Sequence, residues 1–99
     1  MSNEGFDVDE YEKGTEYAPL PLEGLIYYLK HGREIEFSYQ GQSYFIGHSR
    51  EGRTVWIDQT AVSKTFEKNF EEHLSEIFLK SKSLADIFRD EEGVIESIL

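Results

Sequence analysis

Three histidines are the first side chains in this sequence that could bind a metal, and their spacing argues against that role. His31, His48 and His73 lie 17 and 25 residues apart, whereas zinc sites draw ligands from short fixed spacings, such as i and i+4 on one helix. The absence of cysteine removes thiolate zinc centres, Fe–S clusters and cysteine nucleophiles. We therefore expect no metal and no cofactor.

The 20 Asp and Glu residues do not form a recognisable acid–base pair. General acid–base catalysis needs two carboxyls whose surroundings push their pKa values apart, usually inside a cleft. Glu34 and Glu36 fall on the polar side of a predicted strand, and Glu71 and Glu72 on a helix surface, where water solvates them. The sequence contains no GxSxG, glycine-rich phosphate loop or HExxH. We expect the protein not to be an enzyme.

The net charge of −10 argues against direct binding of nucleic acid, because phosphate contacts need Lys and Arg. The acidity is concentrated at the two ends: residues 1–23 carry −6, residues 24–65 carry +1 and residues 66–99 carry −5. The central basic residues and Trp56 therefore do not form a nucleic-acid site. An acidic surface of this kind suits solubility, or docking on a basic protein surface.

No apolar run reaches the ~20 residues that span a bilayer, and no basic start precedes an apolar stretch. Together with the lack of cysteine, this predicts a cytoplasmic protein without a membrane role. The sequence indicates no particular oligomeric state.

Two regions of different character divide the chain. Residues 1–18 carry six acids without a sustained apolar period, so they predict a flexible acidic tail in which Phe6, Val8, Tyr11 and Tyr17 are possible anchors. Residues 19–99 are expected to form a single α+β domain. Its first helix follows from apolar residues at 22, 25, 26 and 29, with Pro21 at its start and Gly32 as its stop.

Alternating polar and apolar residues predict a three-stranded antiparallel meander after this helix. A two-residue turn at Gln40-Gly41 pairs Tyr39 with Gln42, Phe37 with Tyr44 and Ile35 with Ile46, on one apolar face. A second turn at Glu51-Gly52 would pair Val55 with His48 and Ile57 with Ile46. Phe45 and Trp56 then point to the opposite face, with Trp56 opposite Gly47. We favour their burial under the C-terminal segment over their exposure.

The C-terminal third predicts one or two amphipathic helices. Apolar residues at 66, 70, 74, 77 and 78 have helical spacing. Ser83 is a candidate N-cap for a second helix over 84–90, with Asp86 in its first turn. Residues 94–99 fit either an edge strand or a last helical turn.

The hairpin also carries a resemblance. The run REIEFSYQGQSYFI at 33–46, with a glycine-containing turn, an aromatic third strand and the closing segment SLADIF at 83–88, resembles a group of small uncharacterised α+β proteins from Gram-positive bacteria and their phages and mobile elements. This resemblance implies an α+β fold and a bacterial or phage origin. It transfers no catalytic or binding residue.

These observations favour a non-catalytic protein-interaction or regulatory module. Because the apolar helix positions must face the core, carboxylates on the other positions form the candidate interaction surface. These carboxylates are Glu67, Glu71, Asp86 and Asp90. Trp56 is a further candidate, on the sheet. The alternative is a small-ligand-binding or catalytic domain with a cleft between the sheet and the C-terminal helices. A pocket lined by inward carboxylates or His48 would favour the alternative, and a convex acidic face the first function.

Overall fold

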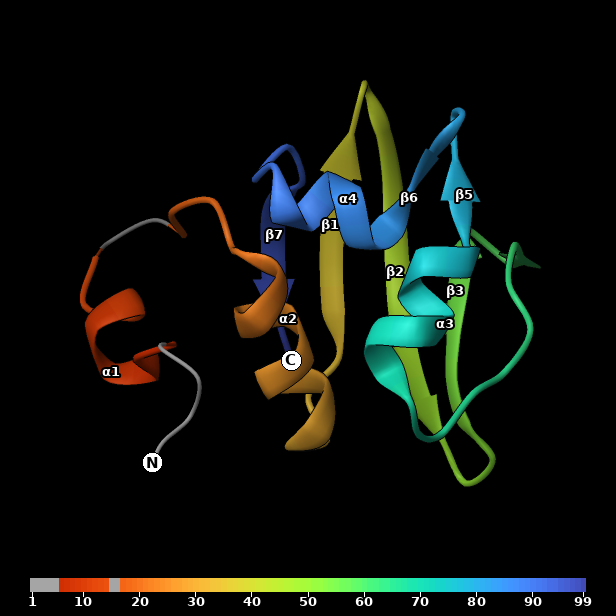
Figure 1. The fold of residues 1–99 in the computed structure, drawn as a ribbon, viewed down its shortest axis with the longest axis horizontal. Helices are drawn as coiled ribbons and strands as arrows, with labels where there is room; N and C mark the ends of the chain where they lie inside the picture. The colour runs from red at the N-terminus through yellow and green to blue at the C-terminus, as the bar shows by residue number, and fades with distance from the viewer. Residues whose placement is uncertain (1–5, 15–16) are drawn as a thin grey trace.

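The structure is a computed structural model that describes residues 6–14 and 17–99. It confirms an α+β fold, in which helices lie over one face of a five-stranded antiparallel sheet (Figure 1). The strand order is β4-β3-β2-β1-β7, and β5 and β6 form a separate two-stranded sheet. The elements are α1 (Val8–Tyr11), α2 (Leu22–Lys30), β1 (Ile35–Tyr39), β2 (Gln42–Ser49), β3 (Gly52–Ile57), β4 (Thr60–Ala61), α3 (Phe70–Glu76), β5 (Phe78–Leu79), β6 (Lys82–Ser83), α4 (Leu84–Arg89) and β7 (Val94–Ile98).

The core lies between the sheet and the helical layer. The inward residues of β1, β2 and β3 pack against α2 and α4, and apart from Arg53 the most deeply buried of these side chains are aliphatic or aromatic. Within the described residues, no helix is long and apolar enough to cross a membrane. The predicted register of the first hairpin is confirmed: Ile35 pairs with Ile46, Phe37 with Tyr44 and Tyr39 with Gln42.

The predicted register of the second hairpin is wrong by two residues. Ile46 pairs with Val55 and His48 with Arg53, because the turn lies at residues 50–51 and Gly52 already belongs to β3. Gly52 has a φ of +130°, and a side chain there would collide with the Phe66 carbonyl. A glycine is therefore needed where the segment before α3 crosses β3. A shift of two residues preserves the side-chain faces, so Val55 is still inward.

The sheet is larger than the predicted meander. β7 pairs antiparallel with β1, with Ile35 opposite Ile98, and β4 extends the other edge beyond β3. The choice left open for residues 94–99 is therefore decided in favour of a strand. Backbone hydrogen bonds between Glu34 and Leu99 in both directions close the end of this pairing.

The predicted helix over 66–78 is too long at both ends. Phe66 forms a β-bridge with Arg53, and α3 begins only after Asn69, which has a φ of +55°. Phe78 belongs to β5, whose turn to β6 places Lys80 and Ser81 at positive φ. The apolar residues keep a helical spacing up to Phe66 at one end and Phe78 at the other. The backbone conformations at these two ends are nevertheless those of a β-bridge and a β-hairpin.

The predicted N-cap of the last helix is confirmed. The hydroxyl oxygen of Ser83 accepts a hydrogen bond from the Asp86 amide at 3.1 Å, and Arg89 lies in the last turn of α4. The helix buries Leu84, Ile87 and Phe88, so the cap fixes the start of an element that contributes much of the core.

We expect Ser83→Ala to lower the free energy of unfolding by about 1 kcal/mol, because one amide of the first turn loses its acceptor. Chemical denaturation would measure the change, with Ser83→Asp as the variant that restores an acceptor. An alanine variant as stable as the wild type would contradict the capping role.

Phe45 and Trp56 occupy the sheet face opposite the helices, as predicted, but the C-terminal helices do not cover them. α2, α3 and α4 all lie on the other side of the sheet (Figure 1). Trp56 pairs with Phe45 rather than with Gly47, and both aromatic side chains are half-buried. A side chain at Gly47 would approach the Phe45 ring to 3.0 Å, so this glycine leaves room for the aromatic pair.

The described part of the N-terminal region contacts α2. The Phe6 side chain is only 5% exposed, and Asp7 caps the short helix α1 by accepting a hydrogen bond from the Glu10 amide at 3.1 Å. Tyr11 donates a hydrogen bond to the Ala18 carbonyl at 2.5 Å. The tail predicted for 1–18 includes residues 1–5 and 15–16, which lie outside the described residues, and its independent motion stays a prediction.

The contacts of Tyr11 lead to an expected pH dependence. Burial, followed by the nearby Tyr17 and Glu12, raises the pKa of Tyr11 from 10.0 to about 12. A raised pKa means that the folded chain holds the phenol proton more tightly than the unfolded chain. This contribution to stability is complete below pH ~10 and is lost as the pH rises towards ~12.

We therefore expect Tyr11→Phe to flatten the fall in stability between pH ~10 and ~12. Urea unfolding at a series of alkaline pH values would show this as a shallower slope. Equal slopes for the variant and the wild type would mean that this phenol keeps its ordinary pKa in the folded chain.

Candidate functional site: a polar groove and an acidic helical face

A buried arginine links the end of α2 to the central strands. Arg53 lies on the inward face of β3 and is 2% exposed. Its Nη2 donates to the Leu29 carbonyl at 2.7 Å, and its Nη1 donates to the Arg33 carbonyl at 2.7 Å and to the Gly47 carbonyl at 3.3 Å. The guanidinium therefore satisfies one carbonyl in the last turn of α2, one in the loop that follows this helix and one on β2.

Burial lowers the pKa of the Arg53 guanidinium, and the nearby Glu34 carboxylate opposes that shift. An arginine is effectively always protonated in proteins, so Arg53 places a permanent positive charge inside the domain. Glu34 does not form an ion pair with it; its carboxylate accepts a hydrogen bond from the His48 amide at 2.9 Å. Backbone carbonyls thus provide most of the solvation of this charge.

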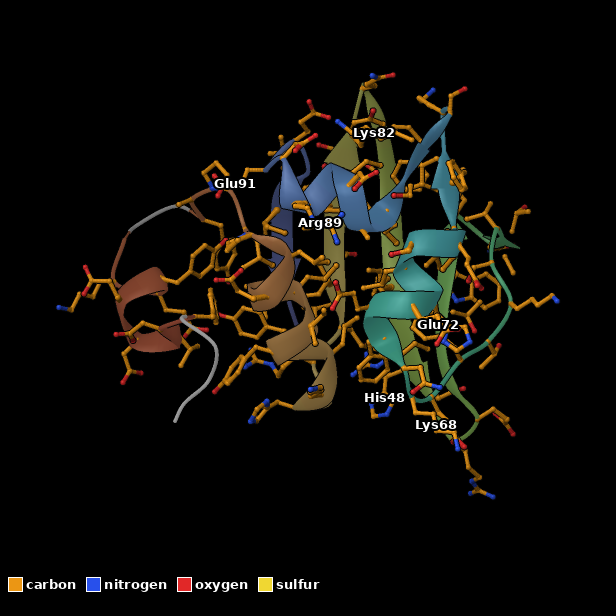
Figure 2. The ribbon with its side chains drawn as sticks, in the orientation of Figure 1. His48, Lys68, Glu72, Lys82, Arg89 and Glu91 are labelled. Atoms are coloured by element: carbon orange, nitrogen blue, oxygen red, sulfur yellow. The ribbon has the colours of Figure 1, made fainter. Side chains whose placement is uncertain are left out.

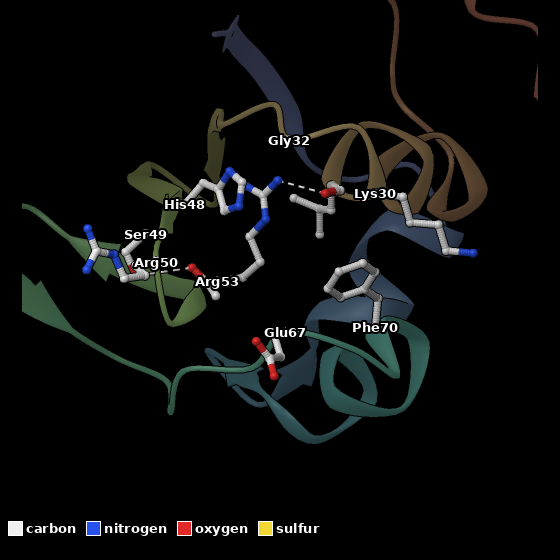
Figure 3. Close-up of a pocket in the computed structure, with 10 residues that line it drawn as sticks. Lys30, Gly32, His48, Ser49, Arg50, Arg53, Glu67 and Phe70 are labelled. Atoms are coloured by element: carbon white, nitrogen blue, oxygen red, sulfur yellow. Dashed lines mark hydrogen bonds between the residues drawn. The ribbon is translucent and has the colours of Figure 1, made fainter.

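Arg53 also lines a groove of about 380 Å³ between the end of α2, the β2–β3 hairpin and the segment before α3. His48, Glu67 and Phe70 line it as well. In Figure 3 these side chains surround the groove, whereas Lys30 and Arg50 extend away from its centre. The groove therefore offers nitrogen donors on one side and a carboxylate on the other.

A second groove, of about 480 Å³, lies between α2 and α3 and shares Lys30, Glu67 and Phe70 with the first. Its other lining residues include Glu71 and Glu72. Glu67 therefore stands where the two grooves meet, and carboxylates become more frequent towards α3.

The histidines lie apart and have separate local contacts. His31 stacks on Tyr27 at the end of α2, and its Nδ1 lies 2.8 Å from the Tyr27 carbonyl. His73 stacks on Phe66 and is half-buried. His48 is exposed in the β2–β3 hairpin, opposite Arg53 rather than Val55. Among the described residues, no group of three His, Cys, Asp or Glu side chains could hold a metal ion.

The four predicted acidic site residues are all exposed on the helical side of the molecule. Three of them are partly neutralised by two cations. The Arg89 guanidinium forms ion pairs with Asp86 and, at 3.4 Å, with Glu71, and the Lys82 ammonium lies 2.7 Å from Asp90. Glu67 takes part in no ion pair with the described residues, so it is the least neutralised of the four.

Lys82 is the more constrained of these two cations. Its ammonium also lies 2.8 Å from the Glu92 carboxylate, and the hydrogen bonds to Asp90 and Glu92 raise its pKa. Figure 2 shows Lys82 and Arg89 on the helical layer, with Glu72 on α3. Even after these pairings, the helical layer carries more carboxylates than cations, since residues 66–92 have eight acids and four bases.

Trp56 belongs to a different surface from the acidic residues. It lies on the open face of the sheet beside Phe45, and the sheet separates it from α3 and α4 (Figure 1). The candidate residues chosen from the sequence therefore lie on two opposite sides of the domain. Arg53 was not among them, although it lies two residues from the inward Val55 on the same strand and so shares its face.

Comparisons of the chain with protein-family models, curated proteins and solved structures found no significant match.

Proposed function

We propose that the protein is a non-catalytic interaction module that binds a basic surface of a protein partner through the acidic side of its helical layer. The observation that carries this proposal is the exposure of carboxylates along α3, α4 and their flanking loops, over a helical layer whose apolar side chains face the core. A surface rich in one sign of charge increases the rate of encounter with a partner of the opposite sign. A cytoplasmic setting and the bacterial or phage origin implied by the resemblance belong to this proposal.

The ion pairs suggest how such a surface would recognise its partner. Arg89 and Lys82 hold Glu71, Asp86, Asp90 and Glu92 in place, so part of the acidic pattern is ordered before binding. Ordered groups lose less conformational entropy on association. Glu67, which lacks such a pair, would gain the most from a partner's Lys or Arg.

We expect the double charge reversal Glu67→Lys with Glu71→Lys to slow association with such a partner by about tenfold or more at low salt. It should also weaken the salt dependence of the rate, because exposed charges are screened over about 8 Å at physiological ionic strength. Both residues are exposed, and loss of the Glu71–Arg89 pair should change stability by less than about 1 kcal/mol. Stopped-flow mixing at several salt concentrations measures these effects.

A matched control changes the net charge equally in other parts of the fold. Asp58→Lys with Glu96→Lys alters two exposed residues outside α3 and α4, and should leave most of the association rate intact. The proposal fails if the two double variants slow association equally, or if Trp56→Ala abolishes binding while Glu67→Lys with Glu71→Lys has no effect. The latter result would make the open sheet face the binding surface.

Binding of a small polar ligand in the groove is a second candidate function. The observation that favours it is the presence of His48, Arg53 and Glu67 around a space of about 380 Å³. His48→Ala separates the two functions, because His48 lies in the β2–β3 hairpin rather than on the acidic helices. The variant should weaken a ligand bound in the groove and leave association with a basic partner unchanged.

A further inference from the structure

One side of α2 contains a notch that is filled by an aromatic ring. Gly24 lies in the first turn of the helix, and a side chain there would come within 2.6 Å of the Phe6 ring and 2.6 Å of Leu20 Cδ1. Glycine is a poorer helix former than alanine. At this position the missing side chain makes room for Phe6, so the glycine has a packing reason.

Aromatic contacts surround the ring of Phe6 in this notch. Its centroid lies 5.6 Å from that of Tyr27, 5.9 Å from that of Tyr28 and 5.7 Å from that of Tyr11. The Tyr28 hydroxyl donates a hydrogen bond to the Glu12 carboxylate. We call the surface formed by Leu20, Gly24, Tyr27 and Tyr28 the α2 face. It provides one apolar notch and one hydrogen-bond donor.

The segment that occupies the α2 face has the features of a docked peptide. α1 is only four residues long, and so short a helix is not stable in water without external contacts. Residues 6–14 contain four acids and one base. Near the Tyr28 end of the face, Arg33 lies 5.8 Å from the Tyr28 ring, which gives this end a positive charge. Shape, hydrogen bonding and charge therefore all match an acidic segment with a leading phenylalanine.

We propose that the α2 face is a peptide-binding surface, that residues 6–14 occupy it in cis, and that a partner protein can replace them with an acidic helical segment that has a Phe anchor. This is a helix-in-groove mode of recognition. It involves a different surface from the acidic helical layer, so a result that contradicts one of the two proposals does not contradict the other.

The test uses a free peptide with the sequence of residues 6–14 and the full-length chain labelled with ¹⁵N. Phe6→Ala in the chain weakens the cis occupant, and amide chemical shifts then report whether the peptide binds. Two matched controls are a peptide in which Phe6 is alanine, and a chain with Phe78→Ala, which removes a phenylalanine that is 63% exposed on β5.

We expect the peptide to shift the amides of Gly24, Tyr27 and Tyr28 in the Phe6→Ala chain, with a Kd in the millimolar range. In the wild-type and Phe78→Ala chains, its apparent affinity should be at least about twofold weaker, because the tethered segment competes at an effective concentration of the order of millimolar, which is similar to the Kd of the peptide. If the Phe6→Ala chain does not fold, Phe6→Leu keeps an apolar group in the notch, and the peptide should bind it with intermediate affinity.

Three results would overturn the proposal. The first is no shift at the α2 face in either variant at several millimolar peptide, and the second is equal binding of the alanine control peptide. The third is a concentration-dependent dimer of the wild-type chain with shifts at the same amides, which would make a second copy the occupant instead of a partner protein.

Discussion

Replacing Phe37 by alanine is expected to lower the free energy of unfolding by about 3–5 kcal/mol. Phe37 lies at the centre of β1 with 0% exposure, and its ring contacts that of Tyr44 at 5.3 Å and that of Phe88 at 5.1 Å between centroids. The substitution removes the ring that joins the sheet to α4. Domains of this size have total stabilities of the order of 5 kcal/mol, so the variant is expected to be largely unfolded at 37 °C.

Thermal denaturation followed by circular dichroism would measure this loss. Phe78→Ala is the matched control, because Phe78 is exposed and should cost less than about 0.5 kcal/mol. A Phe37→Ala melting temperature within a degree or two of the wild type would show that Phe37 faces solvent and that the register of β1 is different.

Replacing Arg53 by alanine is expected to cost about 3 kcal/mol or more. The carbonyls of Arg33 and Gly47 would lose the side-chain donor, and the Leu29 carbonyl would keep only the hydrogen bond from the Gly32 amide at 3.3 Å. Each buried group left without a partner costs about 1–3 kcal/mol. The missing side chain would also leave space between α2 and β3. Water that enters from the groove could donate hydrogen bonds to these carbonyls, which would reduce the loss of stability.

Two comparison variants show whether the geometry or the charge of the Arg53 side chain is responsible for its contribution to stability. Arg53→Lys keeps the positive charge but replaces the planar fork by a single ammonium, so it should recover only part of the stability. Arg50→Ala removes an exposed arginine three residues away and should be close to neutral. Equal stability of the Arg53→Ala and Arg50→Ala variants in urea denaturation would contradict the structural role of Arg53.

Local patterns in the sequence determined several features without reference to the rest of the fold. The alternation through Ile35, Phe37 and Tyr39 and the turn at Gln40-Gly41 fixed the faces and the register of the first hairpin. Ser83 and Asp86, three residues apart, identified the start of α4. Such features depend on residues within one turn or one hairpin, so short-range spacing carries the necessary information.

The candidate site was predicted less well than these elements. The sequence placed Glu67, Glu71, Asp86 and Asp90 on the helical side because their neighbours had to be inward, and this placement agrees with the structure. The Asp86–Arg89 pair has the i, i+3 spacing of one helix, so the sequence alone could have indicated it. The Arg89–Glu71 and Lys82–Asp90 pairs join different elements. They depend on how α3, α4 and the β5–β6 hairpin are arranged, and side-chain spacing within one helix does not specify that arrangement.

Contacts between distant parts of the chain were decided only by the tertiary structure. β7 returns to pair with β1, Phe66 crosses to bridge with Arg53, and Phe6 enters the notch at Gly24. An apolar or glycine residue at each of these positions fits several local conformations equally well. The conformation adopted at each position depends on which apolar surfaces still have to be covered and which backbone groups still lack a hydrogen-bond partner elsewhere in the chain. Only the assembled core determines both.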